Sequence, residues 1–597
     1  MSTKHGAEQI NWNLDDLYTS LSSEAFINDK KQAVELAKAF ENKWKGTLAT
    51  INPEGLKLLL DEYSDLIDLL SKMSSYVYLV WSTNTIETTH GKALAEIGDL
   101  NAGLSQHLVF FDVEWVAVED EKANELMNAS ILTHEKYFLE TARKSKPYML
   151  DESAEKVMVA KTTTARQAWI RFFDELLGAA EFELDGKTLS EQEVLSKLHE
   201  SDRELRIRAA QSLTKTFKGL SRQLTFIFNT VLQDKAANDG LRNYPNWVTS
   251  RHMSNQIDDA TVNTLISSVT ASYGLVQRYY TLKKKLLGLD VMMDYDRYAP
   301  LLKTQTKITW DEAKNTVLDS FGSFDSRIKD ITAKFFDNNW IDAAIKPGKR
   351  SGAYASSSAN SVHPYVFMNY DGRLRDVQTL AHELGHGVHM YLSQKQGPLL
   401  SDTPLTTAET ASVFGEMIVF QQLKAKITDP KEKLALVLGK IDDTIATVYR
   451  QVSMNRFEDA IHTARREEGE LSTERFSELW RKVQEDLYGD SVTLSPEYDL
   501  WWCYIPHFLH SPGYVYAYAF GELLVLALYE LYQQGKPGFE DTYIELLSAG
   551  GSKKPEELVG MFGFDIQSPE FWNQGIRVIE SMIQEAEELA AEIGYGN

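Results

Sequence analysis

The sequence predicts a mainly α-helical protein. Long stretches carry Leu, Ala, Glu and Lys at the spacing of amphipathic helices, for example residues 26–45, 57–80 and 203–238. The chain contains only 15 Pro in 597 residues, which favours long uninterrupted helices because proline breaks them. Strand signals are few and short. A helical fold class therefore accounts for most of the chain.

Two segments predict strands in this helical background. Residues 181–187 alternate in polarity and turn at an Asp-Gly pair, which is typical of a hairpin. Residues 362–370 are rich in aromatic and β-branched side chains and predict a strand. Residues 344–358 are rich in Gly, Ser and Lys, so we expect a loop there. Residues 578–593 predict an acidic amphipathic helix with one solvated face.

Composition excludes some classes of function. The net charge of −24 argues against a nucleic-acid partner and against binding to an anionic membrane. The single cysteine, Cys503, allows no internal disulfide and no cysteine-based zinc cage, and we expect a small buried side chain there. The first residues lack the apolar stretch of a secretory signal, and the apolar runs are too short to span a bilayer. We therefore expect a cytoplasmic protein.

Residues 382–386 read His-Glu-Leu-Gly-His and match the motif HExxH. On a helix, His382 and His386 project from one face and can bind one metal ion. Glu383 lies beside them and can act as the general base that takes a proton from water. Apolar residues at every fourth position from 380 to 392 place the motif inside a helix. The alternative is an ordinary pair of helix histidines.

A catalytic zinc site needs a third protein ligand, because such sites keep the fourth position for water. The next predicted helix, residues 408–416, supplies Glu409 and Glu416, which are seven residues apart and share one face. One could bind the metal while the other accepts a hydrogen bond from a ligating imidazole. Alternatively, Glu409 forms a capping box with Thr406, and Glu416 is an exposed carboxylate.

A second group of polar side chains lies downstream, around a Pro-Gly loop that leads into a helix. It contains His507 and His510, followed by Tyr514 and Tyr518 on one helix face, whereas Tyr516 points largely the other way. Phenols and imidazoles can donate hydrogen bonds to a developing oxyanion. The alternative is an aromatic packing stripe, which two tryptophans just upstream support.

With these residues assembled, the chain resembles the thimet oligopeptidase and oligoendopeptidase F family of zinc metallopeptidases, and is most similar to the oligoendopeptidase F branch. The resembling segments are residues 376–386, 409–416 and 506–518, with weaker matches at 12–18 and 348–354. These segments follow one another in the expected order over nearly the whole chain. The HExxH motif is shared by many zincins, but its combination with the other segments is specific.

The resemblance implies a mainly helical, elongated, zincin-like fold, with a deep substrate channel between two halves and a few short strands near the HExxH helix. It implies one Zn²⁺ ion, held by His382, His386 and Glu409, with Glu383 as general base. The residues that it assigns around this centre are His507, Tyr514 and Tyr518 for the substrate or transition state, and Glu416 and Asp376 for support of the ligands. Gly513 departs from the aromatic residue expected there, which bears on substrate preference.

The expected function is therefore a cytoplasmic zinc endopeptidase that hydrolyses internal bonds of short peptides, without nucleic-acid or membrane partners. Residues 1–200 are expected to form an N-terminal helical region with the hairpin, and residues 201–597 the catalytic domain. One alternative is a zinc carboxypeptidase or dipeptidase on a related helical fold. Another is a non-catalytic peptide-binding protein with a structural metal, although such sites normally have four ligands. A His₂Glu ligand set also accepts manganese or cobalt.

Overall fold

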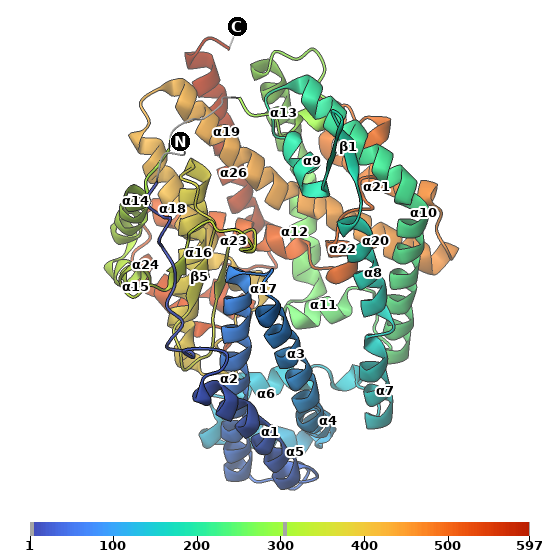
Figure 1. Ribbon diagram of the computed structural model, residues 1–597, viewed down its shortest axis with the longest axis vertical. Coiled ribbons are helices and arrows are strands. Elements are labelled where there is room, and N and C mark those ends of the chain that lie inside the picture. Colours follow the sequence, from blue (N-terminus) through green and yellow to red (C-terminus); the bar gives the residue numbers. More distant parts are fainter. Residues whose placement is uncertain (1–4, 302–306, 596–597) are drawn as a thin grey trace. The chain divides into compact units, whose positions relative to one another are not determined.

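The computed structural model describes residues 5–301 and 307–595, and most of them are helical (Figure 1). By their contacts they form two compact units, each built from three stretches of chain. Unit 1 comprises Met1–Pro147, Gln305–Leu423 and Leu531–Phe564. Unit 2 comprises Tyr148–Thr304, Lys424–Glu530 and Asp565–Asn597. The mainly helical fold class is confirmed, whereas the expected channel and the division at residue 200 stay predictions.

Unit 1 contains two groups of helices and a small sheet. Its first group is α1 (Glu24–Trp44), α2 (Pro53–Thr83), α3 (Thr88–Leu108), α4 (Phe110–Ala117), α5 (Asp120–Met127) and α6 (Lys136–Arg143). Its second group is α14 (Trp310–Phe324), α15 (Ser326–Asp337), α16 (Leu374–Ser393), α17 (Leu405–Ala408), α18 (Thr410–Lys426), α24 (Phe539–Ala549) and α25 (Pro555–Gly560). The predicted helices at residues 26–45 and 57–80 are confirmed by α1 and α2.

The sheet of unit 1 lies against α16 and has the strand order β3-β5-β4. Strand β5 (Tyr365–Phe367) is fully buried, pairs parallel to β3 (Ile341–Asp342), and pairs antiparallel to β4 (Tyr354–Ser356). The strand predicted within residues 362–370 is confirmed. The loop predicted over residues 344–358 is wrong in part, because it contains β4. The Gly- and Ser-rich composition of this segment does not predict the three-residue strand, which forms through its pairing with β5.

Unit 2 is organised around one long helix, α10 (Arg203–Arg242), which confirms the prediction for residues 203–238. Before α10 come α7 (Glu152–Thr162), α8 (Arg166–Gly178), β1 (Phe182–Leu184), β2 (Lys187–Leu189) and α9 (Glu191–Lys197). After α10 come α11 (Thr249–Ser254), α12 (Asp259–Ala271) and α13 (Tyr273–Leu286). The later segments are α19 (Pro430–Thr447), α20 (Tyr449–Glu468), α21 (Thr473–Tyr488), α22 (His507–His510), α23 (Tyr516–Gln533) and α26 (Pro569–Glu592).

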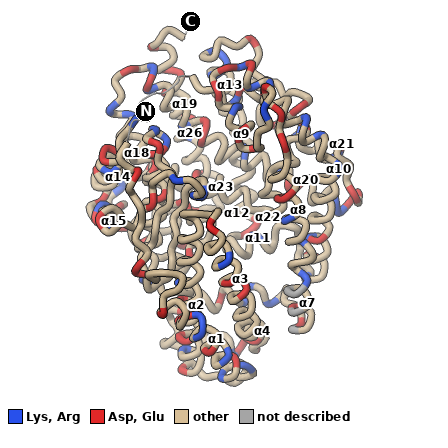
Figure 2. The backbone as a smooth tube through the Cα atoms, viewed as in Figure 1, with Lys and Arg blue, Asp and Glu red and all other residues tan. Residues whose placement is uncertain are grey.

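The predicted hairpin is confirmed by the antiparallel pair β1–β2. Its turn residues, Asp185 and Gly186, have φ values of +51° and +76°, the backbone conformation that Asp-Gly hairpin turns adopt. The acidic C-terminal helix is confirmed by α26. In the part of the chain that is described, every helix is too short or too polar to cross a bilayer. Acidic residues are spread along the helices of both units, with lysines and arginines among them (Figure 2).

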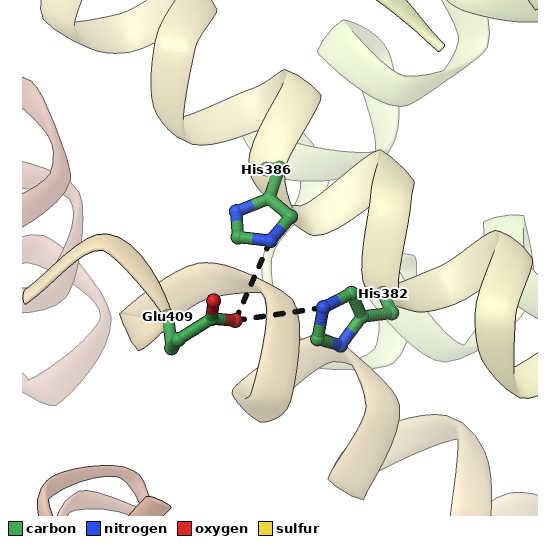
Figure 3. A group of neighbouring side chains, drawn as sticks. All are labelled: His382, His386 and Glu409. Atoms are coloured by element: carbon green, nitrogen blue, oxygen red, sulfur yellow. Dashed lines mark ion pairs between the residues drawn. The ribbon is translucent and has the colours of Figure 1, made fainter. Parts of the chain in front are cut away.

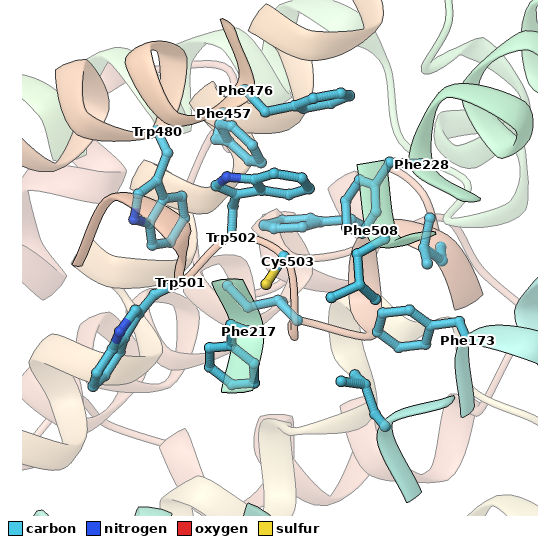
Figure 4. Packing of buried hydrophobic residues seen from close by; sticks show 14 of the residues in the cluster. Phe173, Phe217, Phe228, Phe457, Phe476, Trp480, Trp501, Trp502, Cys503 and Phe508 are labelled. Carbon is cyan, nitrogen blue, oxygen red and sulfur yellow. The ribbon is translucent and has the colours of Figure 1, made fainter. Parts of the chain in front are cut away.

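A large apolar cluster in unit 2 packs α10, α20 and α21 against the chain segment that precedes α23 (Figure 4). Aromatic side chains dominate it, including Phe228, Trp480 and Trp502. Cys503 is fully buried within this cluster, as predicted. Phe508 and Leu509 of the short helix α22, and Val515 just before α23, also belong to the cluster. The cluster therefore anchors the backbone on both sides of residues 510–514.

Candidate metal centre

Helix α16 carries the HExxH sequence on a buried scaffold. Its apolar face, which includes Val377, Leu380, Leu384 and Val388, is 0–1% exposed. Asp376 fixes the first turn, because its carboxylate accepts the backbone N–H groups of Asp371 at 2.8 Å and Arg373 at 2.9 Å. These bonds satisfy donors that a helix start leaves without intrahelical partners. The role of Asp376 around the metal ligands stays a prediction.

His382, His386 and Glu409 lie together in unit 1 (Figure 3). The Nε2 atoms of His382 and His386 lie 3.5 Å and 3.4 Å from Oε2 of Glu409. The two imidazole rings are 4.9 Å apart and nearly perpendicular, so each directs a nitrogen toward the same carboxylate oxygen. The sequence prediction that these three side chains meet agrees with this geometry.

This spacing fits a small divalent metal ion. Two ligand atoms that each lie about 2.1 Å from a tetrahedral zinc ion are about 3.4 Å apart. The two nitrogen-to-oxygen distances of 3.4 and 3.5 Å match that separation. Imidazole nitrogens and one carboxylate are also the donor types of catalytic zinc sites. The three residues can therefore hold zinc with little rearrangement.

Gly385 brings Glu409 within reach of the histidines. A Cβ atom at this position would lie 2.5 Å from the carbonyl oxygen of Ala411 and 2.6 Å from Cα of Ser412, closer than real Cβ atoms come. Glycine therefore allows the backbone of α16 to touch the first turn of α18, the helix that follows Glu409. The four-residue spacing of the histidines does not reveal this role of the glycine between them.

Glu409 occupies a break between helices α17 and α18, so the single helix expected over residues 408–416 is interrupted there. Thr406 lies inside α17, whose N-cap is Pro404, which excludes the capping box considered for Thr406 and Glu409. The Glu409 carboxylate instead accepts a hydrogen bond from Ser412 Oγ at 2.7 Å. This bond falls on Oε2, the same oxygen that faces the two imidazoles, and it restrains the orientation of the carboxylate.

Glu416 lies on the other side of the first imidazole. Its Oε2 atom is 3.4 Å from Nδ1 of His382, so the two ring nitrogens of His382 face one carboxylate each. Burial lowers the pKa of His382, but Glu416, Glu409 and Glu383 outweigh that effect and raise it to about 9. A carboxylate in this position fixes ring orientation and leaves Nε2 for a metal.

Glu383 is the most enclosed carboxylate of the group, with 6% of its surface exposed. Burial raises its pKa above the usual range, while the adjacent histidines and a hydrogen bond from the backbone of Ala355 in β4 oppose the rise. A carboxylate whose pKa is shifted toward neutrality can both accept and release a proton. Its position next to the two imidazoles that could bind a metal is the arrangement that a general base requires.

A cavity of about 310 Å³ adjoins the site on the side of His386. Its walls come from α2, from α16, and from residues 357–360 and 398–403. Two carboxylates, Asp68 and Asp402, contribute to these walls. The cavity offers a ligand both polar and apolar surroundings immediately next to the candidate metal centre.

The second predicted group lies in unit 2. His507, Tyr514 and Tyr518 form a contiguous cluster: Nε2 of His507 is 3.3 Å from the phenol oxygen of Tyr518, and the two tyrosine rings are 4.9 Å apart. Burial lowers the pKa of His507, with further lowering by His510 and Arg450. The Nε2 atom of His510 instead forms a hydrogen bond with Asp174 of α8 at 2.9 Å. Tyr516 is buried, and its phenol oxygen accepts a hydrogen bond from Asn255. The predicted separation of Tyr516 from its neighbours is confirmed.

Three side chains from distant helices hold the backbone of this cluster. Arg166 of α8 donates to the carbonyl oxygens of Leu509 and His510 at 2.6 and 2.7 Å. Arg251 of α11 donates to the carbonyl oxygen of Pro512 at 3.2 Å. The buried carboxylate of Glu458 in α20 accepts the N–H group of Gly513 at 2.8 Å. Sequence analysis could not find these residues, because no local pattern marks them.

Gly513, the departure noted in the sequence, has a structural reason. Its φ of +73° lies in the region that favours glycine, and a Cβ atom there would approach Val248 to 3.0 Å. The backbone can thereby turn sharply between Pro512 and Tyr514, and Tyr514 reaches its place beside His507.

Comparison with protein families gives two matches along the chain. Residues 196–578 match the model described as peptidase family M3, and residues 114–182 match the model described as oligopeptidase F. Among individual relatives, the Oligopeptidase PepF of Bacillus subtilis (strain 168) is 27% identical over 595 residues, covering 98% of this chain and 87% of the relative.

Solved structures share the fold. A structure from Chlamydophila abortus superimposes with a TM-score of 0.83 at 24% identity, covering 98% of this chain and all of the other. An oligoendopeptidase-F structure from Enterococcus faecium gives a TM-score of 0.73 at 21% identity, covering 95% and 99% of the two chains. At these identities the likeness concerns the fold.

Proposed function

Because the chain belongs to peptidase family M3 and is therefore a metalloendopeptidase, we propose that it hydrolyses internal bonds of short oligopeptides with one zinc ion and Glu383 as general base. The observation that carries this proposal is the set of 3.4 and 3.5 Å distances from Glu409 to the two imidazoles, with the buried Glu383 beside them. The name of the Bacillus relative, an oligopeptidase, supports short peptides as substrates.

We assign the metal to His382, His386 and Glu409, because their donor atoms and separations fit zinc. When bound, a zinc ion supplies a Lewis acid that polarises the scissile carbonyl group and acidifies a water molecule. Glu416 keeps the His382 ring in the orientation that directs Nε2 to the site. Ser412 does the same for the Glu409 carboxylate.

Glu383 moves the protons of the reaction. Its carboxylate takes a proton from the attacking water and later delivers that proton to the nitrogen of the leaving amine. The raised pKa of Glu383 suits both steps, because burial brings the carboxylate closer in proton affinity to the groups it serves.

His507, Tyr514 and Tyr518 are proposed to donate hydrogen bonds to the carbonyl oxygen as negative charge develops on it. Such donors stabilise the transition state most when they are positioned beforehand. The bonds from Arg166, Arg251 and Glu458 to the backbone of residues 509–513 provide that positioning. The single cysteine fits the further proposal of a cytoplasmic enzyme, where disulfides are rare.

The test is mass spectrometry of a mixed-length peptide pool incubated with the zinc-loaded protein, with the Glu383→Gln variant as control. Internal cuts in short peptides that are absent from the control would support the proposal. Release of residues only from C-termini would indicate a carboxypeptidase. Intact peptides with protein that carries one zinc ion per chain would contradict the proposal.

A further inference from the structure

Arg450 of helix α20 is a half-buried guanidinium with most of its donors free. Its Nη1 atom donates to the phenol oxygen of Tyr298 at 2.6 Å. Among the described residues, this is the one hydrogen bond of the Arg450 side chain. Its Nε atom is buried and has no hydrogen-bond partner. A guanidinium carries five N–H donors, so the bond to Tyr298 leaves most of them without a hydrogen-bond partner.

The absence of a carboxylate partner distinguishes Arg450 from Arg456 and Arg466 of the same helix. Arg456 pairs with Asp459 at 3.3 Å, and Arg466 pairs with Asp239 at 2.6 Å. Within residues 5–301 and 307–595, no aspartate or glutamate forms an ion pair with Arg450. A cation removed from water without a counter-charge destabilises a folded protein, so its presence calls for an explanation.

The surroundings of Arg450 are phenolic and cationic. Burial lowers the pKa of its guanidinium, and the phenols of Tyr298, Tyr504 and Tyr498 raise it by a larger amount. Arg297 adds a second positive charge, but it is fully enclosed and engaged with the carbonyl oxygen of Asp294 and the phenol of Tyr488. Of these two arginines, Arg450 is therefore the one with N–H donors available to a ligand.

The position of Arg450 connects it with the substrate-binding cluster of unit 2. Its charge is one of the factors that lower the pKa of His507, after burial and His510, so the two side chains lie within electrostatic range. Tyr504, whose phenol raises the pKa of Arg450, is three residues before His507 in sequence. A group that binds Arg450 would thus lie near the side chains proposed to contact the peptide.

We propose that Arg450 binds a carboxylate group of the peptide substrate, with Tyr298 holding the guanidinium in place. The inference rests on the proposed function and adds a determinant of specificity to it. Arginine matches carboxylate geometry with two parallel N–H···O bonds, and such charge-assisted bonds are the strong ones. The carboxylate is either the free C-terminus of the peptide or an acidic side chain.

Three synthetic peptides of one parent sequence separate these sources. The first ends in a free carboxylate, the second in an amide without acidic residues, and the third is that amide with one Gln near its end replaced by Glu. We expect the full-length zinc-loaded enzyme to cleave a carboxylate-bearing peptide with a kcat/KM about 10- to 100-fold above the plain amide, the range for one charge-assisted pair. The peptide that shows this gain identifies the source.

Variants assign the gain to Arg450. In Arg450→Gln, the kcat/KM for the carboxylate peptide divided by that for the plain amide should fall to near one. Arg450→Lys should keep part of this preference. Arg456→Gln makes the same substitution six residues along α20 and should keep the wild-type ratio. Tyr298→Phe should lower the same kcat/KM ratio, because it removes the acceptor of the bond from Nη1 of Arg450. This variant replaces Arg450→Gln in the test if Arg450→Gln does not fold.

Two results would overturn the inference. One is a wild-type enzyme that cleaves all three peptides equally well. The other is a carboxylate preference that survives unchanged in Arg450→Gln, or in Arg450→Lys and Tyr298→Phe together. Either result leaves the peptidase function intact, because the wild type still cleaves the plain amide; failure to cleave any of the three peptides would instead contradict the proposed function.

Discussion

The two groups of candidate catalytic residues are held in place in different ways. In unit 1, the candidate metal ligands come from helix α16 and from the break between α17 and α18, with Gly385 allowing contact between α16 and α18. In unit 2, His507, Tyr514 and Tyr518 are close in sequence, but their backbone is fixed by Arg166, 343 residues away, by Arg251, 261 residues away, and by Glu458, 55 residues away.

This difference separates residues that a local pattern encodes from residues that only the fold can place. The spacing of HExxH puts two imidazoles on one face wherever the helix forms. The group of His507, Tyr514 and Tyr518 acquires its geometry only when α8, α11 and α20 have packed against its backbone. We therefore expect substitutions in unit 1 to change metal content, and substitutions in unit 2 to change turnover without changing metal content.

The largest effect is expected from Glu383→Gln, which removes the proton carrier and leaves both groups in place. Turnover should fall about 10²- to 10⁴-fold, the contribution of a positioned general base. Zinc content, measured by elemental mass spectrometry, should stay at the wild-type value. A variant that keeps near wild-type turnover would contradict the role of Glu383.

Glu409→Ala tests the unit 1 side of the comparison. Loss of the third ligand should leave most chains without zinc after dialysis, because two imidazoles alone hold the ion weakly. Glu416→Ala removes the carboxylate that lies beside Nδ1 of His382. This variant should lower zinc affinity by a smaller factor, about 10 to 100. Equal zinc retention in Glu409→Ala and the wild type would reject Glu409 as a ligand.

Tyr514→Phe tests the unit 2 side. Removing one proposed oxyanion donor should lower kcat about 100-fold with little change in KM. Zinc content and the melting temperature should match those of the wild type. A rise in KM at constant kcat would instead assign Tyr514 to ground-state binding.

Gly385→Ala measures how closely α16 and α18 must approach. The added methyl group would meet the backbone of Ala411 and Ser412, and this overpacking should lower the free energy of unfolding by about 1–3 kcal/mol and weaken zinc binding. Gly439→Ala in α19 is the matched control, since a Cβ atom there meets nothing within 4 Å. That control should be neutral or stabilise the helix slightly. Similar unfolding curves for both variants would exclude the packing role of Gly385.

The smallest effect concerns Glu458, the buried anchor of Gly513. Burial raises its pKa from 4.5 to about 8 in the folded protein. A raised pKa means that its contribution to stability is complete below pH 4.5 and is lost as the pH rises through about 8. Glu458→Gln keeps an acceptor for Gly513 but cannot ionise, so its melting temperature should fall less between pH 6 and pH 8.5. Parallel pH profiles for both proteins would contradict this expectation.

The sequence predicted much of the fold and of the metal centre. The helices α1, α2 and α10 and the β1–β2 hairpin followed from local periodicity and turn chemistry. Spacing left Glu409 open between a metal ligand and a capping box, and the family resemblance assigned it to the metal. Strand β4 escaped prediction because its partner β5, rather than its own composition, makes it a strand. The break at Glu409, the contact at Gly385 and the anchors of residues 509–513 depend on segments far apart in the chain, which local patterns do not encode.

The discontinuous make-up of unit 1 has a consequence for how the enzyme matures. All three candidate ligands have been synthesised once the ribosome passes residue 409, but their support is incomplete. Tyr543 of α24 donates to the carbonyl oxygen of Thr410, next to Glu409, and its ring packs on Phe414 at 4.6 Å. Long-range contacts of this kind form late in folding. If the proposed zinc site is correct, stable binding of the ion would therefore require synthesis of nearly the whole chain.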